Sequence, residues 1–295
     1  MGIFIHLAIS QSISKNDWDK VYRETLPLVE AFQLAESRTI KCRGVDVFCM
    51  VPTKEREEKY GWHDEKIESG WWASGDYQTM REAEEYFLPR DLVCERKENE
   101  RDPDATDDKA PLFGENSTSG REDAMLSALP AYLDYDFEDS LVNNSYELWG
   151  AKTQGEPYHL CLLAIACLIE ARLGRKAFVY GDITKGQCNK AVEMANKILK
   201  DPIKVPDRCD MERLSLRVSD LPLLAAEKVR VFENFYLGVK DAEFGAFLRE
   251  HYDAETLAEY WADRFSRQKV GTVGFSELVN QTLCSGEGLH RSVIY

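Results

Sequence analysis

The sequence predicts an α+β protein, and three observations lead to that class. An apolar stretch at the start of the chain is followed by helical periodicity and then by a segment of alternating residues. A long apolar run at 158–173 is followed at once by a short strand-like run. From residue 221 onward, apolar residues recur at helical spacing. We therefore expect a small β-α-β-β N-terminal part, followed by a mostly helical part containing at least one further strand.

The N-terminal elements follow from local signals. Residues 3–9 form a strand candidate. Ser14 with Asp17 is typical of a helix start, because the serine hydroxyl can accept a bond from a backbone N–H of the first turn. Residues 39–51 alternate about a glycine, which predicts a hairpin. Thr79 and the glutamate three residues later have capping-box spacing, so we expect a helix over the residues that follow, up to a proline.

The central stretch contains the clearest signals in the chain. Residues 158–173 are apolar on nearly every side, which is typical of a buried helix, and the run is shorter than the roughly 20 residues that a bilayer requires. Gly174 is placed to end that helix, and residues 177–180 predict a strand. Thr184 and Gln187 form a capping box for the next helix. Further helices are expected to begin near 207–210 and to occupy 221–236, 242–252, 255–265 and 275–283.

Residues 95–123 differ from the rest of the chain in composition. They combine many charges with Pro, Gly and Ser, and they hold few apolar residues. Such a segment cannot bury enough apolar surface to offset the entropy of ordering it. We interpret it as a flexible charged linker or loop between an α+β part at 1–94 and a predominantly helical part at 124–295.

The overall charge narrows the classes of partner. The chain has 52 acidic and 37 basic residues, a formal net charge of −15. Proteins that bind nucleic acids or anionic membranes present basic surfaces, so we expect neither partner. A basic protein partner is compatible with this charge, and so is a surface that serves solubility alone.

The cysteines and the N-terminus indicate the compartment. None of the eight cysteines belongs to a CxxC pair, and several fall on apolar helix faces, where free cysteine behaves as a small hydrophobe. The first nine residues are too short and lack the basic start of a secretory signal. We therefore expect a reducing, cytoplasmic location.

No intact motif for nucleotide binding, metal binding or nucleophilic catalysis occurs in the sequence, and no two histidines have ligand spacing. We therefore expect no cofactor and no metal. His6, within the first predicted strand, is interpreted as a strand-face residue. Asp182 lies after a predicted strand and before a predicted helix, where ligands collect in open α/β sheets. Helix-start hydrogen bonding explains the same position without a ligand, and we favour that interpretation.

Two further groups are candidate binding residues. Trp71 and Trp72 are adjacent, and aromatic residues often anchor interfaces, although one ring in the core and one over an edge would also explain them. Asp134, Asp136 and Glu138 would share one face of a strand, where carboxylates can hold a hard cation or simply form its polar face.

These observations favour an acidic binding protein without catalysis. An inhibitor or immunity-type protein that neutralises a basic partner is one concrete form of this function. The alternative is a carboxylate-dependent hydrolase or transferase, metal-assisted in its most natural form, that uses Asp182 or the Asp134, Asp136 and Glu138 group.

Overall fold

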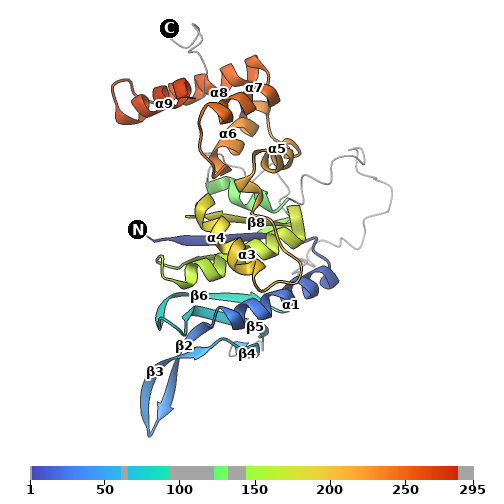
Figure 1. Cartoon of the computed structure of the whole chain (residues 1–295), viewed down its shortest axis with the longest axis vertical. Helices are drawn as coiled ribbons and strands as arrows, with labels where there is room; N and C mark the ends of the chain where they lie inside the picture. Colours follow the sequence, from blue (N-terminus) through green and yellow to red (C-terminus); the bar gives the residue numbers. More distant parts are fainter. Residues whose placement is uncertain (1, 61–65, 93–122, 132–143, 285–295) are drawn as a thin grey trace, which may run out of the picture. The chain divides into compact units, whose positions relative to one another are not determined.

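The computed structural model describes residues 2–60, 66–92, 123–131 and 144–284 (Figure 1). The chain divides into two compact units, one formed by residues 1–128 and 136–206 and the other by 129–135 and 207–295. The α+β class is confirmed, because β-α-β-β opens the chain and the later part is mostly helical with further strands. The predicted boundary at 95–123 stays a prediction, since residues 93–122 lie outside the described part.

The first unit contains all the described strands. Its elements are β1 (Phe4–Ser10), α1 (Lys15–Ala31), β2 (Leu34–Cys42), β3 (Val45–Pro52), β4 (Arg56–Tyr60), β5 (Lys66–Asp76), β6 (Arg81–Pro89), β7 (Ser145–Lys152), α3 (Tyr158–Leu173), β8 (Ala177–Gly181) and α4 (Lys185–Asn196). The 3₁₀ helix η1 (Ala124–Ala131) precedes β7. The second unit contains α5 (Met211–Ser219), α6 (Ala225–Phe235), α7 (Ala242–His251), α8 (Ala254–Ser266) and α9 (Val273–Cys284).

Two antiparallel sheets organise the first unit. One has the order β7-β1-β8, so the N-terminal strand lies in the middle. The other has the order β3-β2-β5-β4, and β6 also pairs with β5. Strands β6 and β7 are therefore the edges at which the two sheets approach each other, and this places the cavity described below.

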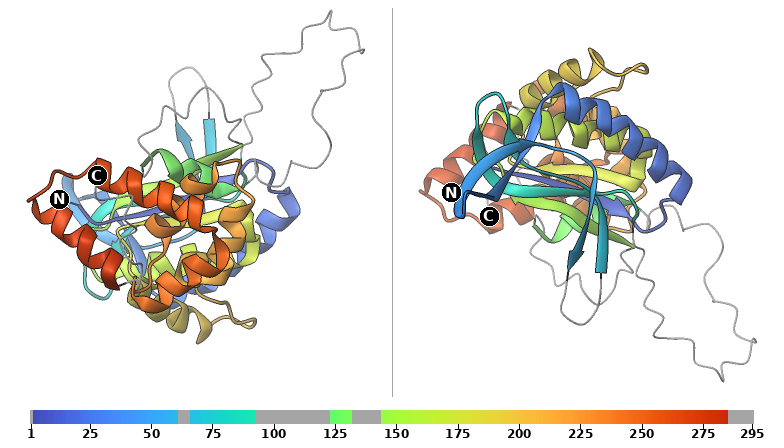
Figure 2. Two further views of the ribbon diagram at one scale, coloured as in Figure 1. Left: turned by 90° about the horizontal axis from the view of Figure 1, so that it is seen from above. Right: turned by 90° about the horizontal axis from the view of Figure 1, so that it is seen from below.

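The core of the first unit is built around α3. Eleven of its sixteen residues are buried, and it packs against α1, α4, β1 and β8 (Figure 2). Leu163 and Ile165 are fully buried, as expected for a helix that is apolar on nearly every side. Among the described residues, no helix has the length and apolar character needed to cross a membrane.

The predicted helix starts are largely confirmed by their caps. Ser14 accepts a hydrogen bond from the Asp17 N–H at the start of α1. Thr184 and Gln187 form the complete capping box of α4, and Asp210 caps α5. These contacts are local, and for this reason spacing alone identified them.

The predicted helix after Thr79 is wrong, because this segment forms strand β6 and pairs with β5. Thr79 instead lies in the turn between the strands, where its N–H donates to Asp76 Oδ1 at 2.7 Å and its hydroxyl donates to Oδ2 at 2.6 Å. In β6, Tyr86 and Leu88 are buried while Phe87 between them is only partly buried, a period of two. Pairing with a distant strand has therefore overridden a local helix signal.

Candidate functional site

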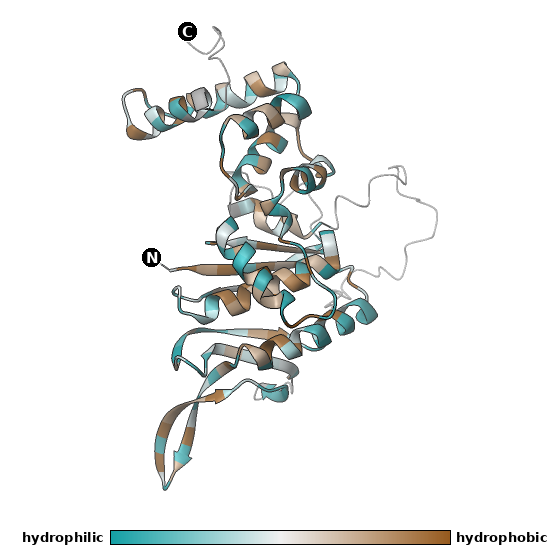
Figure 3. Ribbon diagram, in the orientation of Figure 1, coloured by the Kyte–Doolittle hydropathy of each residue, from teal (hydrophilic) through white to brown (hydrophobic). Residues whose placement is uncertain are grey.

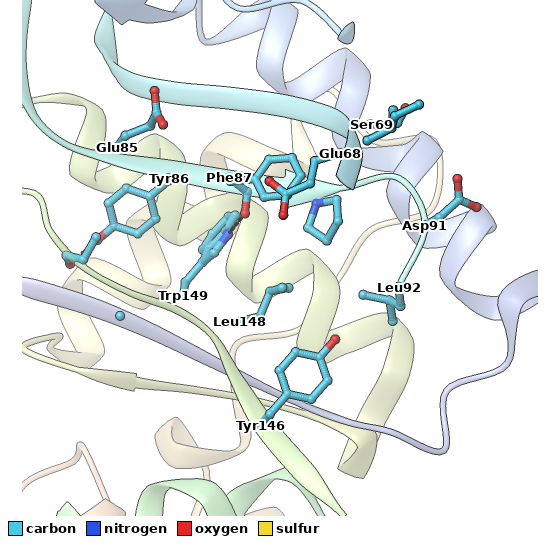
Figure 4. Close-up of a pocket in the computed structure, with 14 residues that line it drawn as sticks. Glu68, Ser69, Glu85, Tyr86, Phe87, Asp91, Leu92, Tyr146, Leu148 and Trp149 are labelled. Carbon is cyan, nitrogen blue, oxygen red and sulfur yellow. Dashed lines mark hydrogen bonds between the residues drawn. The ribbon is translucent and has the colours of Figure 1, made fainter. Parts of the chain in front are cut away.

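A cavity of about 400 Å³ lies where the edges of the two sheets approach each other (Figure 4). Its walls come from β5, β6, the residues just after β6, and β7. All of these segments belong to the first unit. The cavity is therefore formed by side chains that lie far apart in the sequence and meet only in the folded sheet pair.

Side-chain hydrogen bonds connect β6 with β7 across the gap. The indole Nε1 of Trp149 donates to the Phe87 carbonyl at 2.7 Å, and the Tyr86 hydroxyl donates to the Ala151 carbonyl. The Lys152 N–H donates to Glu84 Oε2 at 2.8 Å. Because these bonds replace the backbone ladder of a continuous sheet, the two edges stay apart and leave room between them.

Buried aromatic rings support the wall of the cavity. Trp149 is 3% exposed and makes edge-to-face contacts with Trp71, at 5.9 Å, and with Tyr86, at 5.3 Å. Burial raises the pKa of the Tyr86 phenol above its ordinary value, so the hydroxyl remains a donor at neutral pH. This packing fixes the orientation of the rings in the wall, and a preorganised site binds with a smaller ordering cost.

The charge of the cavity is one-sided. Of the fourteen residues that line it, three are acidic (Glu68, Glu85 and Asp91), four are aromatic and none is basic. Figure 4 shows the Glu68 carboxylate beside the Phe87 ring, whereas the carboxylates of Glu85 and Asp91 point outward. The lining therefore offers anionic and aromatic groups to a ligand, with no side chain that would attract an anion.

The acidic groups also repel one another. Glu58 on β4 lies directly opposite Glu68 on β5, and like charges in that position destabilise a sheet. Burial raises the pKa of Glu85, against the effect of nearby Arg56, and the charges of Glu36 and Glu58 raise it further. Arg56 Nε lies 2.6 Å from Glu58 Oε1, so an arginine of the chain itself offsets part of this repulsion.

A stack of side chains connects this acidic region with a buried ion pair. Glu36 is 3% exposed, and its Oε2 lies 2.5 Å from Arg56 Nη1. The Arg56 guanidinium lies 4.1 Å from the centre of the Trp72 ring, which stacks on Phe87 at 4.3 Å. Trp72 therefore holds in place the Phe87 ring that lines the cavity.

Trp71 and Trp72, the two tryptophans that are candidate binding residues, both lie in the core. Trp71 is 0% exposed and donates from Nε1 to Thr25 Oγ1 at 3.2 Å, and Trp72 is 2% exposed. Packing in the core explains the two adjacent tryptophans without a binding partner, so a direct role of either ring in binding stays a prediction. Asp134, Asp136 and Glu138 lie outside the described residues.

Asp182 has a different partner from the one expected. Its Oδ2 accepts a hydrogen bond from the Phe4 N–H at 3.1 Å, whereas the N-cap of α4 is Thr184. The expectation that its carboxylate binds N–H groups at the start of this helix is therefore wrong. The carboxylate lies just past the end of β8 and ties that end to β1.

A second polar cluster lies on the three-stranded sheet. His6 Nδ1 is 2.7 Å from Glu147 Oε2, and the Tyr180 hydroxyl donates to the same carboxylate oxygen. The His6 ring stacks on Tyr180, with the ring centres 4.7 Å apart. The His6 side chain is 23% exposed and that of Glu147 is 43% exposed, so solvent reaches the cluster.

A β-bulge and two glycines build this cluster. The register shifts between Leu7 and Ala8, which brings Glu147 opposite Ala8 and onto the face that carries His6. A Cβ on Gly150 would lie 2.0 Å from Glu147 Oε1, and one on Gly181 would lie 2.8 Å from His6 Cδ2. Only glycine at both positions leaves room for the ring and the carboxylate.

No protein family, curated protein or solved structure shows significant similarity to this chain. Within the described part of the chain, no group of three or more His, Cys, Asp or Glu residues is arranged to hold a metal ion. Two candidate sites therefore carry the functional proposals below. They are the acidic, aromatic cavity between β6 and β7 and the polar cluster of His6, Glu147 and Tyr180.

Proposed function

We propose that this protein binds a basic protein partner without catalysis, and that the cavity between β6 and β7 receives a lysine or arginine side chain of that partner. The observation that carries this proposal is the Glu68 carboxylate beside the Phe87 ring, in a lining with four aromatic residues and no basic side chain. Aromatic faces attract ammonium and guanidinium groups, and carboxylates form charge-assisted hydrogen bonds with them.

The whole chain supports the same partner class. A net charge of −15 steers a basic protein toward the surface and repels phosphate-rich nucleic acids and anionic membranes. An inhibitor or immunity-type role in the cytoplasm is the concrete form that we favour. The free thiols of Cys42, Cys49 and Cys161, within the described residues, are compatible with such a reducing compartment.

A titration with a short arginine-rich peptide tests this proposal. We expect the NMR signal of the Trp149 indole N–H to shift on binding, because this group lies in the cavity wall. Glu68→Gln should weaken binding about tenfold, roughly the effect of losing one charge-assisted contact. Glu250→Gln, an exposed acidic position in the second unit, makes the same change in net charge and should leave binding nearly unchanged.

Equal weakening by both variants would show that only net charge matters and would overturn the cavity as the site. A peptide of the same length in which glutamate replaces arginine serves as the ligand control and should not bind. Capture of partners from the native cell extract, compared between the wild-type protein and Glu68→Gln, then identifies the basic protein.

A second candidate function, general acid–base catalysis, is favoured by the His6–Glu147 hydrogen bond. A carboxylate at Nδ1 orients a histidine ring and leaves Nε2 to exchange a proton with a substrate. Asp182 is less suited to this role because its carboxylate binds the Phe4 N–H. A screen of ester, phosphoester and glycoside substrates tests it, since any turnover must disappear in His6→Gln and fall sharply in Glu147→Gln.

A further inference from the structure

The β2–β3 hairpin extends beyond the other strands of the five-stranded sheet and carries apolar segments on both of its strands (Figures 1 and 3). Its two-residue turn consists of Arg43 and Gly44, with φ values of 51° and 83°. Positive φ at both positions is the geometry of a tight type I′ hairpin, which keeps the two strands closely paired to their ends. The projecting hairpin is therefore a defined structure.

One face of this hairpin is apolar and exposed. Ile40 and Val47 are direct cross-strand partners, and they are 46% and 41% exposed. Val45, paired with Cys42 on the same face, is 64% exposed. Single exposed apolar residues are ordinary, but neighbouring ones on a projecting arm are typical of a contact surface.

The outer edge of β3 is also open. Among the described strands, β3 pairs with β2 alone. In a two-residue hairpin the residues flanking the turn form a hydrogen-bonded pair, so Val45 and Val47 direct their backbone groups toward β2. The alternate residues Asp46, Phe48 and Met50 therefore direct theirs outward. Before Pro52, Asp46 is the only charge and there is no lysine or proline of the kind that usually protects an edge.

The charge of the hairpin indicates which partner fits. Residues 34–52 contain three basic and two acidic side chains, a net charge of +1, in a chain whose net charge is −15. A basic partner gains nothing from this surface. Two copies of the chain repel each other over most of their surfaces, and the hairpin is a place where they can approach without that repulsion.

We propose that β3 pairs antiparallel with β3 of a second copy, about a two-fold axis at Phe48. This register places Phe48 opposite the same residue of the second copy and Asp46 opposite Met50, so every outward backbone group along this stretch finds a partner. A two-fold contact requires a self-complementary surface, and the apolar faces of the two hairpins then become continuous. This inference is independent of the proposed cavity function.

Sedimentation of the full chain over a range of concentrations tests the dimer. Phe48→Pro removes an outward N–H that β2 does not use, and an edge position of this kind tolerates proline. We expect a dimer for the wild type and a monomer for this variant, with unchanged circular dichroism. Phe48→Val keeps the N–H and should still dimerise. A wild-type monomer at every concentration, or a Phe48→Pro dimer, would overturn the proposal.

Cysteine cross-linking tests the register. In a background with Cys42→Ser and Cys49→Ser, Phe48→Cys should form a disulfide between copies, because Cα atoms of a hydrogen-bonded antiparallel pair lie about 5.5 Å apart. Asp46→Cys should not, because its equivalent in the second copy is displaced by about 13 Å along the strand. Cross-linking of Asp46→Cys without that of Phe48→Cys would exclude this register.

Discussion

His6 Nδ1 and Glu147 Oε2 lie 2.7 Å apart, although the two residues are 141 positions apart in the sequence. The contact depends on the bulge in β7, because without the extra residue Glu147 would point to the opposite face of the sheet. It also depends on Gly150, which lies directly opposite His6 in the register. The backbone of β7 therefore determines whether a histidine–carboxylate pair exists in this protein.

Gly150→Ala should break this pair. The new Cβ would lie 2.0 Å from Glu147 Oε1, so the carboxylate must move, and we expect a loss of about 1–3 kcal/mol in the free energy of unfolding. Urea denaturation measures this loss. Gly186→Ala in α4 is the control, since a Cβ there meets only Thr184 Oγ1 at 4.0 Å and should stabilise the helix by about 0.5–1 kcal/mol. Equal effects of the two variants would contradict this account.

Truncating buried side chains of α3 should strongly lower the free energy of unfolding. Leu163→Ala and Ile165→Ala each remove a fully buried side chain, and we expect each to cost about 2–5 kcal/mol through lost burial and a residual cavity. Leu216→Ala, at a side chain that is 62% exposed, should cost less than about 0.5 kcal/mol. Chemical denaturation compares the three variants, and unchanged midpoints for both α3 variants would show that this helix is not the centre of the core.

Asp182 and Thr184 should contribute to stability by different contacts. Asp182→Ala leaves the Phe4 N–H without its acceptor, at a cost of about 0.5–1.5 kcal/mol, while Asp182→Asn keeps an acceptor and should cost less. Thr184→Ala removes the N-cap of α4 and should cost about 0.5–2 kcal/mol. Hydrogen exchange separates the two, because exchange at Phe4 should accelerate in Asp182→Ala alone.

His159 should make stability depend on pH. Its side chain is buried, its Nδ1 is bonded to Thr153 Oγ1 at 2.7 Å, and burial lowers its pKa below 6.5, against the opposing charge of Asp182. The unfolded chain then binds the proton more readily, so stability falls as pH drops from about 7 toward the lowered value. His159→Gln, followed by denaturation at several pH values, should show a flatter dependence. An unchanged slope would exclude His159 as the cause.

Salt should affect the two proposed contacts in opposite directions. Binding of the arginine-rich peptide at the cavity should weaken as salt rises, since exposed charges are screened within about 8 Å at physiological ionic strength. Dimerisation through β3 should strengthen, because salt screens the repulsion between two chains of net charge −15. Measuring both equilibria in one salt series tests this, and a common direction would show that one of the two contacts is assigned to the wrong surface.

Local chemistry was enough to predict the helices of this protein. The caps at Ser14 and Thr184 involve residues three positions apart, and the burial of 158–173 follows from its apolar composition alone. The hairpin about Gly44 was predictable for the same reason, because its turn and its strands are contiguous in the chain.

The strands of the cavity were not predictable in this way. Residues 81–89 have the spacing of a helix start, yet pairing with β5 makes them a strand. Nothing local indicates that segment 145–152 pairs with β1 and stands opposite β6. Strand pairing depends on contacts between distant residues, so the grouping of Glu68, Phe87 and Trp149 into one anionic, aromatic cavity emerges only when the two sheets form.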